Sequence, residues 1–253
     1  MTQPTLLSTT ELSIGYNNIC VASNVTLTLA GGDVLAVVGH NGSGKSTLIK
    51  TLLRALPPIK GELNWPNGRP EPIAYLGQRT DFDSQFPIRV SDLAAMGAWP
   101  KLGFFHKIDD ECRTRISAAL HRTGTSEIAN MPLNKLSEGQ LQRTLFARTM
   151  VQNAPLILLD EPFTAIDQDT ETELLSLIGD WATEGRAVIL VLHDLSAVLK
   201  YCNLALLLGD GQALFGNPRE ILAPRNLIRH KYLSKSRVDW MHDMYAQGGG
   251  KIV

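Results

Sequence analysis

The chain lacks the sequence features of a membrane-spanning, secreted or disulfide-stabilised protein. Its three cysteines, Cys20, Cys112 and Cys202, are widely spaced and form no CxxC pair. This pattern favours reduced, buried thiols over disulfides or a zinc site. The longest apolar runs, such as 204–208, fall far short of the ~20 residues that a spanning helix requires. No basic cluster followed by an apolar stretch opens the sequence, so we expect no secretory signal.

Neither sign of charge dominates the composition. The chain has 24 Lys and Arg against 25 Asp and Glu, a net charge of -1, which gives no global attraction to nucleic acid. Hydrophobic content of 44% and charged content of 19% are ordinary for a globular protein and argue against disorder. The six histidines, including His40, His106 and His121, show no metal-ligand spacing. We therefore expect no zinc site in the chain.

The segment Gly39–Thr47, with the sequence GHNGSGKST, is the most informative stretch of the chain. It follows the apolar run 34–38, typical of a buried strand, and leads into a helical pattern at 47–53. The glycines allow successive backbone NH groups to point into one concavity, and the helix adds its partly positive N-terminus. The segment therefore predicts a phosphate-binding loop for a nucleoside triphosphate, in which Lys45 reaches the β- and γ-phosphates and Ser46 binds the bridging Mg²⁺. The predicted nucleotide contacts in this loop are Gly39, His40, Asn41, Gly42, Ser43, Gly44, Lys45, Ser46 and Thr47.

A second apolar run, 156–159, ends in the acidic pair Asp160 and Glu161. Ligands of open α/β sheets bind at the carboxyl ends of the parallel strands. We predict that Asp160 holds Mg²⁺, directly or through water, and that Glu161 orients and deprotonates an attacking water. A solvated turn would explain the pair by itself, but the upstream phosphate loop favours the catalytic interpretation.

The apolar periodicity predicts an α/β protein: a P-loop NTPase core with a mostly parallel sheet, an N-terminal antiparallel β subdomain and an inserted helical subdomain. We divide the single domain 1–253 into the core with its β subdomain (1–80 and 154–222), the helical subdomain (81–153) and a short tail (223–253). Strands are predicted at 6–13, 25–30, 34–38, 61–65, 73–76, 156–159, 187–192 and 204–208, and helices at 47–53, 90–98, 108–122, 141–151, 168–183, 195–200 and from 218.

The segment Leu136–Gln140, with the sequence LSEGQ, precedes an apolar helical stretch, and Ser137 and Gln140 have the spacing of a capping box. It resembles the signature motif of the nucleotide-binding subunits of ATP-binding cassette (ABC) transporters, with Glu138 where glycine is more usual. The resemblance extends over 6–222, nearly the whole chain, and the motifs occur in family order.

The resemblance implies roles for further residues. Tyr16 is similar to the aromatic residue that stacks on adenine, and Gln78 to the loop glutamine that contacts Mg²⁺ and the attacking water. Asp167, in the altered segment TAID, resembles the aspartate of the dimer-contact loop, and His193 the switch histidine that contacts the γ-phosphate. The expected catalytic residues are thus Lys45, Gln78, Glu161 and His193, and the expected Mg²⁺ ligands are Ser46, Gln78 and Asp160.

The resemblance also implies an assembly. Ser137 and Gly139, with Gln140, would close over ATP held by a second subunit. Because the sequence contains one phosphate loop and one signature, the second copy would come from another chain, most simply an identical one. The implied state is a head-to-tail, ATP-dependent dimer that works with transmembrane permease subunits at the cytoplasmic face of the membrane.

The segment after Gln78, including 86–93 and 96–97, resembles that of zinc and manganese importers. It favours zinc as cargo, while manganese and iron or an iron chelate remain open, because the extracytoplasmic binding protein and the permease select the metal. A second class, a soluble cassette ATPase in assembly of, for instance, iron–sulfur clusters, would share the core motifs without a permease. A P-loop kinase is disfavoured, since it needs neither the 136–140 segment nor His193.

Overall fold

The structure is a computed structural model that describes residues 3–77, 87–99 and 108–233. The strands are β1 (Thr5–Tyr16), β2 (Ile19–Ala30), β3 (Val34–Gly39), β4 (Lys60–Asn64), β5 (Ile73–Leu76), β6 (Leu156–Leu159), β7 (Ala187–Val191), β8 (Leu204–Gly209) and β9 (Gln212–Gly216). The α-helices are α1 (Lys45–Leu52), α2 (Val90–Ala95), α4 (Asp110–Arg122), α5 (Glu138–Gln152), α6 (Gln168–Thr183), α7 (Leu195–Tyr201), α8 (Pro218–Ile221) and α9 (Pro224–Arg229), and the 3₁₀ helices are η2 (Met96–Ala98) and η3 (Leu133–Lys135).

The larger sheet has the strand order β5-β6-β7-β3-β8-β9. Strand β6 pairs in parallel with β5 on one side and β7 on the other, so that Leu156 lies opposite both Ile73 and Ala187. Every residue of β3, β6 and β7 is buried, as expected for apolar strands covered on both faces. Strand β9, which was not predicted, closes the other edge by antiparallel pairing with β8. The predicted α/β class is confirmed.

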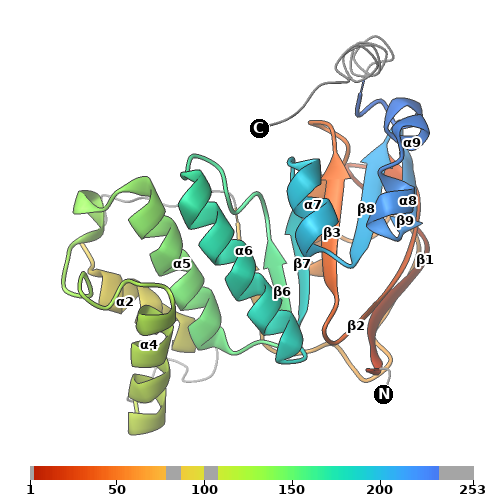
Figure 1. The fold of residues 1–253 in the computed structure, drawn as a ribbon. Coiled ribbons are helices and arrows are strands. Elements are labelled where there is room, and N and C mark those ends of the chain that lie inside the picture. The colour runs from red at the N-terminus through yellow and green to blue at the C-terminus, as the bar shows by residue number, and fades with distance from the viewer. Residues whose placement is uncertain (1–2, 78–86, 100–107, 234–253) are drawn as a thin grey trace, which may run out of the picture. The chain divides into compact units, whose positions relative to one another are not determined.

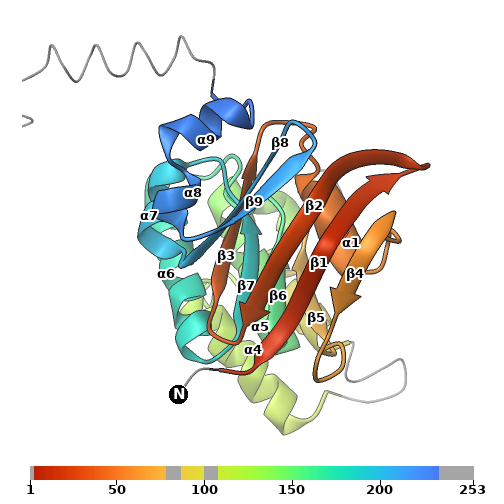
Figure 2. The same ribbon diagram turned by 90° about the vertical axis from the view of Figure 1, so that its right-hand side faces the viewer.

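The smaller sheet has the order β2-β1-β4 (Figure 2). Strands β1 and β2 are joined by Asn17 and Asn18, both in the left-handed conformation with φ of 50° and 62°. Asparagine tolerates this conformation better than most residues, so the two-residue turn is sterically accessible. Strand β4 pairs antiparallel with β1, with Ser8 opposite Asn64. The predicted N-terminal antiparallel sheet is present, but β1 and β2 are longer than the predicted strands.

The described residues form two compact units. The first draws on the ranges Met1–Leu7, Thr28–Leu35 and Trp65–Val191, and the second on Ser8–Leu27, Ala36–Asn64 and Leu192–Val253. In the first unit, α5 packs against α2, α4 and α6 (Figure 1). The Phe146 ring lies 5.7 Å from that of Trp181 and 6.2 Å from that of Phe163, so three aromatic side chains join α5 to α6 and to the loop that precedes it.

The second unit contains α1, the segment before it, and the C-terminal helices. Helix α8 packs against β8, β9 and α7. It begins as predicted, because the Asn217 side chain accepts a hydrogen bond from the Arg219 amide and Pro218 occupies the first turn. Among residues 3–77, 87–99 and 108–233, no helix combines the length and apolarity needed to cross a membrane.

The cysteines differ in exposure. Cys112 and Cys202 are buried, as predicted, and burial raises the pKa of the Cys202 thiol to about 12. Cys20 is exposed, so the prediction of a buried thiol is wrong at this position. The reason is its place at the start of β2, an edge strand of the smaller sheet, directly after the asparagine turn.

Candidate nucleotide-binding site

The predicted phosphate loop connects the buried strand β3 to the start of α1. Gly42 and Gly44 have φ of +82° and +103°, a conformation that side-chain-bearing residues rarely adopt. A Cβ atom at Gly39 would lie 2.5 Å from the Leu208 carbonyl oxygen and 2.3 Å from the Ser43 hydroxyl, so only glycine fits there. The glycines of the motif are therefore required by the geometry of the loop.

Lys45 folds over this loop. Its side-chain ammonium donates hydrogen bonds to the carbonyls of Gly39, at 2.8 Å, and His40, at 3.2 Å, and the residue is only 6% exposed. The Ser43 hydroxyl is buried and has no hydrogen-bond partner among the described residues. A phosphate oxygen would satisfy such a hydroxyl, so the loop fits an anionic ligand. Ser46 and Thr47 follow in the first turn of α1, both half-buried.

Tyr16 ends β1 in the same unit, and 52% of its surface is exposed. Its neighbour Gly15 has no room for a side chain, because a Cβ atom would lie 1.9 Å from the Ile19 carbonyl oxygen. Strand β2 returns towards the phosphate loop, where Val21 would be 3.2 Å from a Cβ atom on Gly44. An accessible aromatic ring on this hairpin is suited to stacking on a nucleotide base.

His193 is exposed in the short connection between β7 and α7, in the second unit. The next residue, Asp194, caps α7 by accepting hydrogen bonds from the amides of Ser196 and Ala197, at 2.9 and 3.3 Å. The His193 carbonyl accepts a hydrogen bond of 2.8 Å from the Tyr232 hydroxyl. The imidazole is therefore presented from a backbone that is fixed on both sides.

The acidic pair Asp160 and Glu161 lies at the carboxyl end of β6, as predicted, in the first unit. The Asp160 amide donates to the Leu76 carbonyl at 2.8 Å, and the residue is 3% exposed. Glu161 adopts a left-handed backbone with φ of +52°, which is uncommon for a glutamate. A carboxylate supplies the oxygen ligands that Mg²⁺ prefers, so Asp160 at the carboxyl end of β6 fits a place beside a cation. Gln78 lies outside the described residues.

The capping box predicted for Leu136–Gln140 is confirmed. The Ser137 hydroxyl accepts from the Gln140 amide at 3.2 Å, and the Gln140 side chain accepts from the Ser137 amide at 3.0 Å. Gly139 follows in the first turn of α5, where a Cβ atom would lie 3.3 Å from the Thr170 hydroxyl. The small residue keeps the helix N-terminus open to a ligand, with its partial positive charge.

Asp167 caps α6 next to this helix start. Its carboxylate accepts from the Thr170 amide at 2.8 Å and from the Thr170 hydroxyl at 2.9 Å. The backbone hydrogen bond from Thr170, followed by the hydroxyl bond, lowers the pKa of the Asp167 carboxyl. Arg143 of α5 donates to the same hydroxyl at 3.3 Å and pairs with Glu173 at 2.5 Å. These contacts join α5, which begins within the Leu136–Gln140 segment, to Asp167 at the start of α6.

The structure thus groups the predicted residues within its units. The first unit brings together Ser137, Gly139, Gln140 and Asp167, and it also contains Asp160 and Glu161. The second contains Tyr16, the loop Gly39–Thr47 and His193. Sequence reasoning did not identify Tyr232, whose contact with His193 spans 39 residues and has no local sequence signal.

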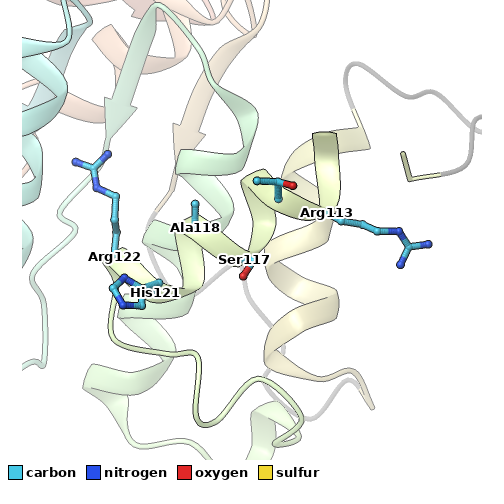
Figure 3. Close-up of a pocket in the computed structure, with 6 residues that line it drawn as sticks. Arg113, Ser117, Ala118, His121 and Arg122 are labelled. Atoms are coloured by element: carbon cyan, nitrogen blue, oxygen red, sulfur yellow. The ribbon is translucent and has the colours of Figure 1, made fainter. Parts of the chain in front are cut away.

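A hollow of about 650 Å³ lies along α4 in the first unit. Arg122 at its end is engaged by Asp180 and Glu184, at 3.1 and 2.9 Å. No lining residue was predicted as a site residue, and we assign the hollow no role in nucleotide binding. The lining residues, shown in Figure 3, are Arg113, Thr114, Ser117, Ala118, His121 and Arg122.

Comparison with known proteins agrees with this geometry. The family model of the ABC transporter matches residues 22–164. The chain is 31% identical to the manganese transport system ATP-binding protein MntB of Bacillus subtilis over 222 residues, 86% of this chain and 88% of that protein. It is 30% identical to the chelated iron transport system membrane protein YfeB of Yersinia pestis over 238 residues, 88% of this chain and 80% of that protein. A solved structure assigned to the metal-chelate type of ABC transporter, in an inward-facing conformation, is 32% identical, with a TM-score of 0.82 over 91% of this chain and 90% of that chain.

The chain therefore belongs to the ABC transporter family. It is the ATP-binding subunit of such a transporter, and it hydrolyses ATP.

Proposed function

We propose that this chain powers an importer of divalent transition metal ions. The observation that supports the proposal is the similarity, over 86% and 88% of the chain, to subunits named for manganese transport and for chelated iron transport. The phosphate loop supports ATP binding, because Lys45 is buried in it and the Ser43 hydroxyl has no hydrogen-bond partner among the described residues.

In the proposed reaction, Tyr16 stacks on adenine, and the loop amides with Lys45 hold the phosphates. Glu161 accepts a proton from the attacking water, whose oxygen bonds to the γ-phosphorus. The bond from that phosphorus to the β–γ bridging oxygen breaks, and ADP and phosphate leave. His193 contacts the γ-phosphate throughout.

Ser46, Asp160 and Gln78 would hold Mg²⁺ beside the β- and γ-phosphates. The bound ion would neutralise charge on the phosphate oxygens. The burial of Asp160 and the position of Ser46 in the first turn of α1 are consistent with this ligand set, which contains only oxygen donors.

The functional state is proposed to be a head-to-tail homodimer in contact with permease subunits. Ser137, Gly139 and Gln140 of one subunit would close over ATP bound to the loop of the other, with Asp167 near the dimer contact. Hydrolysis would remove the γ-phosphate contacts and allow the dimer to reopen. This assignment places the chain peripherally at the cytoplasmic face of the membrane, with 81–153 as the helical subdomain between the core segments 1–80 and 154–222.

Zinc is the cargo favoured by the segment after Gln78, and the named relatives support manganese and chelated iron as well. The test is to reconstitute the chain with the permease encoded beside it and to add the cognate binding protein loaded with each metal. We expect one of the zinc-, manganese- or iron-loaded forms to stimulate ATP turnover. Stimulation by none of them would contradict metal import.

A role in assembly without a permease is the competing function. Purification of the chain from its native membrane distinguishes the two: co-purification with a polytopic membrane protein supports transport, whereas capture of soluble partners alone supports assembly.

A further inference from the structure

The C-terminal end of the described chain contacts the predicted switch histidine. The Tyr232 hydroxyl donates a hydrogen bond of 2.8 Å to the His193 carbonyl, between residues 39 positions apart in the second unit. A hydrogen bond of this length and type has good geometry for an O–H donor and a carbonyl acceptor. Because it reaches the backbone of a residue in a short connection, it can fix the orientation of that residue's peptide group.

Tyr232 is placed by a tight turn at the end of α9. Its amide donates to the Leu227 carbonyl at 2.8 Å, and the Lys231 amide donates to Ile228 at 3.0 Å. This is the hydrogen-bond pattern of a Schellman turn, in which the residue after the cap is left-handed. Lys231 occupies that position with φ of +55°, although glycine is the usual choice. An ion pair between Lys231 and Asp210 accompanies this conformation.

The same turn is packed against the β8–β9 hairpin. His230 is buried, with its Nδ1 3.2 Å from the Gly209 carbonyl oxygen. A Cβ atom at Gly209 would lie 1.9 Å from the His230 carbonyl oxygen, so only glycine permits this approach. Figure 2 shows α8 and α9 beside the hairpin. Segment His230–Tyr232 therefore packs against the end of β8.

The hairpin in turn borders the phosphate loop. The Leu208 carbonyl of β8 faces Gly39, where it leaves no room for a Cβ atom. Lys231 chiefly, and then His230, lower the pKa of the Asp210 carboxyl at the turn between β8 and β9. A continuous set of contacts thus runs from the phosphate loop through β8 and His230–Tyr232 to the backbone of His193.

We propose that Tyr232 is a positioning residue for His193. Its hydroxyl holds the His193 carbonyl so that the imidazole is oriented towards the γ-phosphate of ATP in the Gly39–Thr47 loop. The inference rests on the proposed role of His193 in hydrolysis. Fixing a catalytic group in advance lowers the cost of reaching the reactive geometry, which improves turnover more than binding.

The test is Tyr232→Phe in the full chain, which keeps the ring and removes only the donor. We expect ATP turnover at saturating ATP to fall about fivefold, with the ATP KM changed less than about twofold, as for loss of one hydrogen bond used in the transition state. Thermal stability should be unchanged. The matched control is Tyr201→Phe, which removes a tyrosine hydroxyl from α7 of the same unit and should leave turnover unchanged.

A double-mutant cycle with His193→Ala separates this inference from the proposed function. If Tyr232 acts through His193, Tyr232→Phe should cause no further loss in the His193→Ala background. Independent, multiplicative losses would overturn the inference, as would full kcat in Tyr232→Phe while His193→Ala is impaired. Full turnover in His193→Ala would instead overturn the proposed role of His193, and the inference with it.

A second measurement does not depend on activity. The hydrogen bond holds the peptide group between His193 and Asp194, so we expect the Asp194 amide to exchange faster with solvent in Tyr232→Phe, with exchange in α6 unchanged. Unaltered exchange at Asp194 would overturn the claim that the hydroxyl fixes this connection.

Discussion

The Lys45 ammonium is bonded to the carbonyl of Gly39, six residues earlier, at 2.8 Å, so the lysine of the phosphate loop is held by the loop itself. This contact holds a buried cation in the loop that is predicted to bind the β- and γ-phosphates. Because the Lys45 side chain is already ordered before ATP binds, less conformational entropy is lost on binding.

Replacement of Lys45 by methionine removes this cation while keeping much of its volume. We expect affinity for ATP to fall by about 10- to 100-fold, because charge-assisted hydrogen bonds to the phosphates are lost. Titration with a fluorescent ATP analogue measures the effect. Lys50→Met, at an exposed position of the same helix, is the control and should bind ATP normally. Equal affinity in both variants would contradict the assignment.

Glu161→Gln should retain ATP binding but slow turnover by ~10² or more, about 3 kcal/mol of barrier, because the amide cannot accept the proton of the attacking water. The same variant should accumulate as an ATP-dependent dimer in size-exclusion chromatography. Glu127→Gln, at an exposed position of the same unit, is the control and should change neither turnover nor dimer formation. Normal turnover in Glu161→Gln would contradict the proposal that Glu161 accepts the proton of the attacking water.

Gly139→Ala tests the open helix start at the signature motif. Alanine favours the helix by ~1 kcal/mol, and the approach to Thr170 at 3.3 Å opposes it, so folding stability should change little. The added methyl would cover the helix N-terminus, and we expect ATP-driven dimerisation to weaken about tenfold or more. Gly179→Ala, on α6 with open space around it, serves as the control. Normal dimerisation in Gly139→Ala would contradict the proposal that the start of α5 contacts ATP bound to the second subunit.

The Asp167 cap predicts a pH dependence of stability. Because hydrogen bonds from Thr170 lower the pKa of the carboxyl in the folded state, its stabilising effect is present above the unfolded pKa and is lost as pH falls below about 4. Asp167→Asn keeps a good cap but cannot titrate, so its melting temperature should fall less on acidification than that of the wild type. Identical acid profiles for Asp167→Asn and the wild type would disprove this origin.

Several elements could be predicted because their determinants are local. The strands 73–76 and 156–159 and the helix 168–183 have the predicted bounds, since each is a sharply bounded apolar run or an amphipathic stretch. The glycines and lysine of Gly39–Thr47 and the capping box at Ser137 likewise follow from local geometry. For these two sites, the spacing of a few neighbouring residues was enough to predict the local structure.

Other features depend on contacts between distant segments. Strand β9, Gln212–Gly216, has only partly buried or exposed residues and exists because the left-handed turn at Asp210 and Gly211 folds it back on β8. The contact of Tyr232 with His193 depends on packing of His230, after α9, against Gly209 of β8. Local propensity cannot predict such pairings, because the tertiary fold creates them.

The unequal exposure of the thiols makes the native chain suitable for site-directed labelling. Cys20 is open to solvent on the strand that follows Tyr16, whereas Cys112 is buried and the Cys202 thiol stays protonated at neutral pH. A maleimide dye should therefore attach at one place without any engineered cysteine. If Tyr16 stacks on adenine as proposed, the emission of this dye should change when ATP binds.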